Sequence, residues 1–186
     1  MSADEPVLSL SNVDVHFEKA GGGVNPFATR DTVRAVDGVD LDIDSNDVVA
    51  IVGESGSGKT TLGKTAVGLQ KPTGGSISYR GQDIWQAKGW GSNPEIPFEE
   101  IRRSLQIIHQ DPGAALNPNR TVLSSLAAPL KQWQPDLGPQ DREARILHFI
   151  ERVGMSPPEA YAPRYPHQLS GGARPRLARV RARLMT

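Results

Sequence analysis

The segment that decides the fold is VVAIVGESGSGKTT, residues 48–61. Its first part, Val48–Val52, is an unbroken apolar run rich in β-branched side chains, which is typical of a parallel strand buried on both faces. The part from Gly53 to Thr60 matches the pattern G-x-x-x-x-G-K-[ST] of a phosphate-binding loop. Residues 59–69 then have the composition of a helix. This order of strand, loop and helix predicts a site for a nucleoside triphosphate.

Each part of the loop has a chemical task. Glycines let the backbone turn its N–H groups towards phosphate oxygens, and the following helix adds the positive end of its dipole. Lys59 would place a charge on the β- and γ-phosphates, and the hydroxyl of Thr60 can ligate Mg²⁺. The candidate residues are Gly53, Glu54, Ser55, Gly56, Ser57, Gly58, Lys59, Thr60 and Thr61. The alternative is a glycine-rich turn with an incidental lysine, and the loop alone does not separate kinases, GTPases and ATPases.

The composition excludes several classes of protein. The formal net charge of the 186 residues is zero, so no overall basic field favours nucleic acid. The absence of cysteine excludes a disulfide framework and thiolate metal sites. The N-terminus is acidic, and no apolar stretch reaches the roughly 20 residues that cross a bilayer. We therefore expect a soluble, cytoplasmic protein that reaches a membrane only through partners.

Outside the loop, the apolar pattern predicts further strands and helices. Alternation over residues 7–17 and again over 36–43 indicates half-buried strands. Shorter strands are expected at residues 76–80 and 105–109. Amphipathic helices are expected at 121–131, at 140–153 and from Ser170 to the C-terminus.

Two further motifs restrict the class of protein. The tetrapeptide LSGG, residues 169–172, precedes a helix that Ser170 can cap, and its glycines leave N–H groups open to an anion. Viewed alone, an N-cap with flexible glycines explains it equally well. Upstream, the segment IIHQDP at 107–112 reads as a strand that ends in a polar residue, Gln110.

In their order along the chain, the phosphate loop, the segment ending in Gln110 and the LSGG segment resemble the motifs of ATP-binding-cassette (ABC) ATPases. The segments RAVDGV (34–39), QDP followed by LNP (110–118) and RYPHQLSGG (164–172) resemble the subfamily that drives dipeptide and oligopeptide import. The resemblance implies ATP and Mg²⁺ as ligands. Ser170, Gly171 and Gly172 would bind the γ-phosphate of ATP held by an opposite subunit. Gln110 would contact Mg²⁺ and the attacking water.

The resemblance also implies an aromatic residue that stacks on adenine at the end of the first strand. Phe17 occupies that position. A flat ring suits any adenine and reads no hydrogen-bond pattern. The alternative is that Phe17 is an ordinary core residue.

The implied fold class is α/β. It combines a P-loop NTPase core with a parallel sheet around residues 48–52, an N-terminal antiparallel β lobe, and a helical subdomain at about 113–167. The implied partners are a second ABC ATPase subunit, in a homo- or heterodimer, integral-membrane permease subunits and, indirectly, an extracytoplasmic solute-binding protein. Nucleic acid is not expected. The implied location is cytoplasmic, peripheral on the inner face of the cell membrane.

The sequence departs from the family's pattern after Gln110. No apolar run ending in Asp-Glu follows, so the Walker B segment, the D-loop, the switch histidine and the C-terminal segment are absent from residues 1–186. We therefore expect an incomplete ABC ATPase fold, a partial nucleotide-binding domain, that binds ATP but hydrolyses it poorly. A non-catalytic nucleotide-binding fragment and a soluble non-transport ABC ATPase are the alternatives. Peptides, nickel and other small solutes all stay open as cargo.

The sequence of the last predicted helix also departs from the family's pattern. Ala173 replaces the usual glutamine, Pro175 falls in the first turns, and five arginines lie between 174 and 183. Leu177, Val180 and Leu184 form one narrow apolar stripe. A basic amphipathic helix can bind an anionic membrane or nucleic acid, and the alternative is a solvated helix end.

Overall fold

The computed structural model describes residues 5–18, 32–87, 94–108 and 116–184. The chain divides into two compact units, residues 1–105 and 106–186. Each unit has a hydrophobic core of its own. In the described residues, no helix combines the length and the apolar character needed to cross a membrane.

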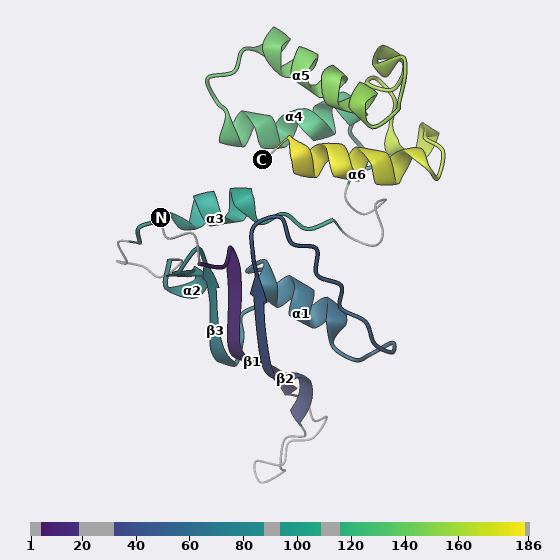
Figure 1. Cartoon of the computed structure of the whole chain (residues 1–186). Helices are drawn as coiled ribbons and strands as arrows, with labels where there is room; N and C mark the ends of the chain where they lie inside the picture. The colour runs from purple at the N-terminus through teal and green to yellow at the C-terminus, as the bar shows by residue number, and fades with distance from the viewer. Residues whose placement is uncertain (1–4, 19–31, 88–93, 109–115, 185–186) are drawn as a thin grey trace, which may run out of the picture. The chain divides into compact units, whose positions relative to one another are not determined.

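The first unit is built on a four-stranded antiparallel sheet (Figure 1). Its strands are β1 (Leu8–Glu18), β2 (Thr32–Ile43), β3 (Gly74–Tyr79) and β4 (Gln82–Asp83), in the spatial order β2-β1-β3-β4. The central strand β1 pairs with β2 from Leu8 opposite Ile43 to Glu18 opposite Thr32. The prediction of an N-terminal antiparallel lobe is therefore confirmed.

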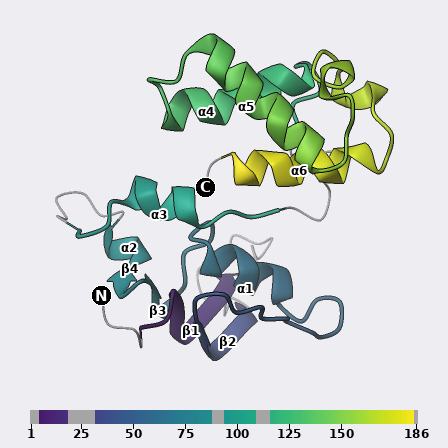
Figure 2. The same cartoon turned by 45° about the horizontal axis from the view of Figure 1, so that its top comes forward.

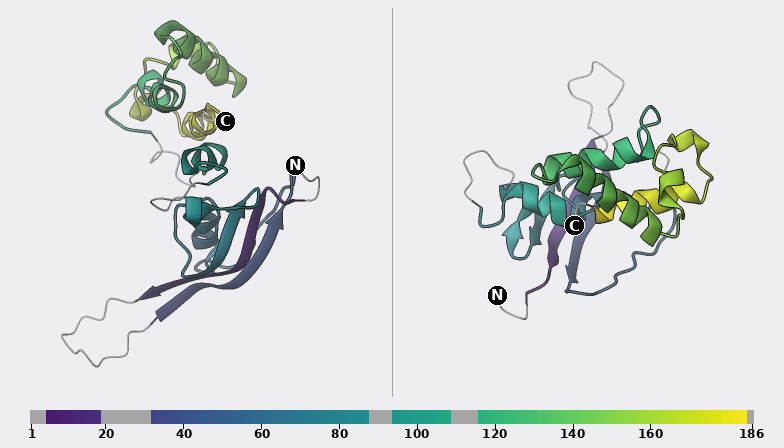
Figure 3. Two further views of the ribbon diagram at one scale, coloured as in Figure 1. Left: turned by 90° about the vertical axis from the view of Figure 1, so that its left-hand side faces the viewer. Right: turned by 90° about the horizontal axis from the view of Figure 1, so that it is seen from above.

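In the described part of the first unit, helices cover one face of the sheet. Figure 3 shows α1 (Lys59–Ala66) against that face, and Figure 2 shows the same arrangement from another angle. Alternate residues of β1, such as Val13 and Val15, are fully buried there with Ile77 of β3 and Leu62 of α1. The short helices α2 (Ile84–Ala87) and α3 (Phe98–Ser104) add Ile84 and Ile101 to the same core.

The segment Val48–Val52 does not form the predicted parallel strand. Its residues pair with no strand in the described part of the chain, and the side chains of Val48 and Val52 are 96% and 91% exposed. A parallel strand needs hydrogen-bonding neighbours as well as apolar side chains. Because the described sheet offers it none, this run lies exposed at the surface without regular secondary structure. The strand expected at 105–109 is likewise not formed over 105–108, while His109 lies outside the described residues.

The second unit is a small helical bundle. It consists of α4 (Val122–Trp133), α5 (Pro139–Arg152) and α6 (Ala173–Arg183), with two 3-10 turns, η1 (Pro158–Ala160) and η2 (Pro166–Gln168). Thr121 caps α4, because its hydroxyl accepts a hydrogen bond from Ser124 N at 3.2 Å. Leu126 of α4, Ile146 of α5 and Leu177 of α6 meet in one core. The predicted helices at 121–131 and 140–153 are confirmed to within two residues at either end.

The arginine-rich helix α6 places its charges at the surface. Leu177, Val180 and Leu184 are buried, as the apolar stripe predicts, whereas Arg179 and Arg183 are exposed. Pro175 is the third residue of α6, where a backbone N–H would have no acceptor within the helix, so the missing N–H of proline costs no helical hydrogen bond. No guanidinium of α6 is therefore buried in the core, and the departures at 174–183 are compatible with a folded helix.

We predict that the exposed valines promote self-association without stabilising the fold. The double variant Val48→Thr/Val52→Thr should bind less of an apolar dye and form fewer oligomers in light scattering. Its free energy of unfolding should stay within about 0.5 kcal/mol of the parent's, as is usual for surface changes. The matched control is Val13→Thr, which buries a hydroxyl and should cost about 1–3 kcal/mol. Equal losses in both variants would contradict the exposed position of 48–52.

Candidate functional site

The predicted phosphate loop forms an open turn that leads directly into α1. Gly53 to Ser57 are exposed. Ser57 N donates to Glu54 O at 3.2 Å and closes the turn. Gly56 and Gly58 have φ values of 85° and 88°, which glycine adopts readily and other residues rarely do. The two glycines therefore set the path of the loop.

Gly58 also fixes the loop against the sheet. A β-carbon at this position would overlap the carbonyl oxygen of Ala35 on β2 and would lie 3.8 Å from the side chain of Val36. The backbone of the loop therefore lies directly on β2, with no room for a side chain between them. Sequence reasoning missed the role of Ala35, because a carbonyl contact between residues 23 positions apart leaves no signal in residue type.

Lys59 is the cation of the loop. Its ammonium group donates to the carbonyl oxygens of Gly53, at 2.8 Å, and Glu54, and to Ser57 Oγ at 3.3 Å. These acceptors are carbonyl and hydroxyl oxygens, and none is a carboxylate. The positive charge is therefore held over the loop without being neutralised by these contacts, and an arriving phosphate can replace them.

The N-terminus of α1 provides further donors. The helix begins at Lys59 with Gly58 as its N-cap, no side chain caps it, and its first turn contains no acidic residue. Among the described residues, no acceptor is found for the amides of Gly56 and Gly58. Thr60 is exposed in the first turn, and Thr61 accepts a hydrogen bond from the Thr65 hydroxyl through its carbonyl, at 2.7 Å. The result is a concentration of free N–H groups and positive charge, which suits an anion.

Phe17 lies near this loop at the end of β1. It pairs with Val33 on β2, and its side chain is 41% exposed. Gly58 contacts Ala35, which lies two residues from Val33 on β2. The positions beside Phe17 and beside Gly58 are therefore about 7 Å apart along the strand. The alternative of a buried core residue is therefore wrong, whereas adenine stacking stays a prediction.

The residues of the other two motifs lie apart from the loop in the chain. Gln110 is outside the described residues. Ser170, Gly171 and Gly172 are exposed and belong to the second unit. The idea that Ser170 caps the following helix is wrong: the N-cap of α6 is Gly172, no side chain caps it, and Ser170 contributes its carbonyl oxygen to Ala173 N at 3.1 Å.

Residues 36–186 match the ABC transporter family, and the chain belongs to that family. The match includes the phosphate loop and the LSGG segment. It also agrees with the α/β class expected from the sequence.

Several relatives are named as ATP-binding proteins of transport or import systems. The chain is 34% identical to the oligopeptide transport ATP-binding protein OppF of Salmonella typhimurium, a match that covers 96% of this chain and 51% of that protein. It is 38% identical to the oligopeptide transport ATP-binding protein AppF of Bacillus subtilis, with the same coverage. It is also 38% identical to the glutathione import ATP-binding protein GsiA of Escherichia coli, covering 96% of the chain and 27% of that protein.

Solved structures support the same fold. The dimeric bacterial ABC transporter cassette MJ0796 aligns with a TM-score of 0.73 at 25% identity, covering 94% of this chain and 68% of the cassette. The chain spans about half the length of the oligopeptide relatives that it matches.

We predict that Gly58→Ala damages both the fold and the loop. The left-handed backbone and the overlap with Ala35 should together cost about 2 kcal/mol or more in unfolding free energy. The matched control is Gly63→Ala in the same helix, where a β-carbon meets nothing within 4 Å and should stabilise the helix by about 0.5–1 kcal/mol. Denaturant unfolding of both variants measures the difference. A neutral Gly58→Ala would show that the loop does not lie on β2.

Proposed function

We propose that this chain binds ATP with Mg²⁺ through residues 53–61, as part of the ATP-binding subunit of an ABC importer for di- or oligopeptides. The observation that carries the proposal is the loop itself. Its unneutralised lysine, its free amides and the start of α1 come together in one exposed turn. A triphosphate offers the negative charge and the many acceptor oxygens that such a turn requires.

The residues present fit this ligand. Lys59 would exchange its carbonyl contacts for the terminal phosphates, and the amides of Gly56 and Gly58 would donate to phosphate oxygens. The exposed hydroxyl of Thr60 would hold Mg²⁺, which would neutralise the charge that develops on the phosphates. Phe17 would stack on adenine, since it is exposed on the strand beside the one that the loop contacts. Gln110 would complete the metal site.

The proposals about the peptide cargo and the partners are supported by the names of the relatives. OppF and AppF are named for oligopeptide transport and GsiA for glutathione import, and glutathione is itself a peptide. We therefore propose that the chain works with a second ATPase subunit, whose phosphate would be met by Ser170, Gly171 and Gly172. Permease subunits would hold it at the cytoplasmic face of the membrane, and an extracytoplasmic solute-binding protein would deliver the cargo.

We predict that ATP binding depends on Lys59. Lys59→Ala removes the cation of the loop and should weaken ATP binding by about 2–4 kcal/mol, the loss of a charge-assisted contact in a partly desolvated site. Calorimetric titration with a non-hydrolysable ATP analogue and Mg²⁺ measures this change. The matched control is Lys64→Ala, an exposed lysine in the last turn of the same helix. Equal affinity in Lys59→Ala and the parent would refute the proposed site.

Hydrolysis by the 186-residue chain should be slow. The dipeptide Asp-Glu does not occur between residues 111 and 186, so no such carboxylate follows a strand there to orient the attacking water. Loss of a single transition-state contact typically costs about 10²–10³ in rate. We therefore expect turnover at least about 100-fold below the ten per second of a median enzyme.

A phosphate-release assay on the monodisperse chain measures this rate. Lys59→Ala reports the contribution of contaminating ATPases. Turnover near one per second that disappears in Lys59→Ala would contradict the expectation. Such a result would make the chain a working ATPase without the Asp-Glu segment.

A further inference from the structure

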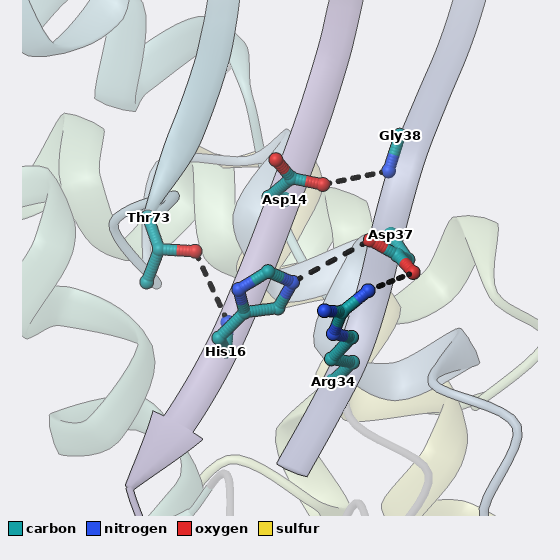
Figure 4. Close-up of polar contacts among 6 residues, drawn as sticks. All are labelled: Asp14, His16, Arg34, Asp37, Gly38 and Thr73. Carbon is teal, nitrogen blue, oxygen red and sulfur yellow. Dashed lines mark hydrogen bonds and ion pairs between the residues drawn. The ribbon is translucent and has the colours of Figure 1, made fainter. Parts of the chain in front are cut away.

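The face of the sheet opposite to α1 carries a cluster of side chains of the types that can ligate a metal ion. Asp14 and His16 lie two residues apart on β1, so they share the face that Val13 and Val15 do not occupy. Asp37 joins them from β2 (Figure 4). The three residues can place one ligand atom each within 4.8 Å of one another.

A bulge in β2 brings Asp37 into this cluster. Val13 pairs with Val39, whereas Val15 pairs with Val36, so β2 contains one more residue than β1 over this interval. The extra residue alters the alternation of β2 and places Asp37 beside His16. Asp14 holds the bulge, because its Oδ1 accepts a hydrogen bond from Gly38 N at 2.7 Å.

Thr73, which precedes β3, fixes the backbone of Asp14 and His16 through hydrogen bonds on the side of β1 away from β2. Thr73 Oγ1 accepts a hydrogen bond from His16 N at 3.1 Å, and Thr73 N donates to Asp14 O at 2.7 Å. A β-carbon at Gly74 would lie only 2.7 Å from Asp14 Oδ2, so the glycine leaves that oxygen free of crowding. The positions of Asp14 and His16 are therefore set before any ligand arrives.

The imidazole of His16 has an unused ring nitrogen. Its Nε2 is inaccessible to solvent and makes no hydrogen bond, and it lies 3.6 Å from Asp37 Oδ1. That separation is close to the roughly 3.4 Å between two ligands of tetrahedral Zn²⁺. The Asp37 side chain is 59% exposed and can rotate to close the rest of the site.

We infer that Asp14, His16 and Asp37 bind a divalent metal ion of the zinc type, with solvent completing its coordination. One imidazole and two carboxylates are a donor set that Zn²⁺ accepts, whereas Mg²⁺ and Ca²⁺ prefer oxygen donors alone. Arg34 is the competing cation, since its Nη1 lies 3.4 Å from Asp37 Oδ2. This site lies on the face opposite to the phosphate loop and does not depend on the proposed function.

The experiment is a zinc titration of the complete chain, freed of metal with a chelator, in competition with a chromophoric chelator. The parent chain should bind one Zn²⁺. His16→Gln, Asp14→Asn and Asp37→Asn should each weaken binding by more than about tenfold, since loss of even an indirect partner of a metal costs that much. Arg34→Gln should strengthen binding about five- to tenfold, because it removes the charge that competes for Asp37. Cobalt should show a visible absorption spectrum that His16→Gln abolishes.

Matched controls separate the site from general effects. His148→Gln removes an exposed histidine of α5, and Lys59→Ala removes the cation of the phosphate loop; neither should change zinc affinity. If His16→Gln does not fold, the zinc affinities of Asp37→Asn and Arg34→Gln test the inference, because both side chains are exposed and their replacement should leave the fold intact. The inference is overturned if the parent binds no zinc. It is also overturned if Asp37→Asn and Arg34→Gln both bind zinc as the parent does.

Discussion

The first unit depends on the pairing of β1 with strands on both of its sides. β2 and β3 both hydrogen-bond to β1, so its alternation decides which side chains face the helices. Val13 and Val15 enter the core with Leu62 and Ile77. The residues that alternate with them, Asp14 and His16, must then lie on the polar face. A single strand therefore positions both the hydrophobic core and the proposed metal site.

The same sheet also fixes the position of the phosphate loop. Gly58 rests on the carbonyl of Ala35, and Ala35 lies on the strand that pairs with β1 near Phe17. Seating of the loop therefore requires that β1 and β2 are already in register. This explains why the proposed nucleotide site, although made of contiguous residues, still depends on long-range contacts. Binding at the loop should in turn stabilise the sheet, because a ligand that binds only the folded chain favours folding.

The second unit packs an arginine-rich helix, α6, into its core through the apolar side of that helix alone. α6 offers Leu177, Val180 and Leu184 to a core shared with α4 and α5. Its arginines stay outside, and Arg176 donates to the carbonyl oxygens of Val153 and Gly154, at 3.4 and 3.0 Å, beyond the end of α5. Arg176 thus donates to two carbonyl groups that directly follow the end of α5, where the helix itself provides no donor. The LSGG segment precedes a helix that is anchored within its own unit.

The sequence by itself determined the features that depend on neighbouring residues. These are the phosphate loop, the alternation of β1, and helices α4 and α5 with their apolar faces. Tertiary structure alone decided the features that need a distant partner. Val48–Val52 has the composition of a buried strand, yet it is exposed because no described strand pairs with it. Likewise, only the bulge in β2 brings Asp37 to His16, and only the fold places Ala35 under Gly58. Composition states what a segment can do, whereas hydrogen-bonding partners far along the chain decide what it does.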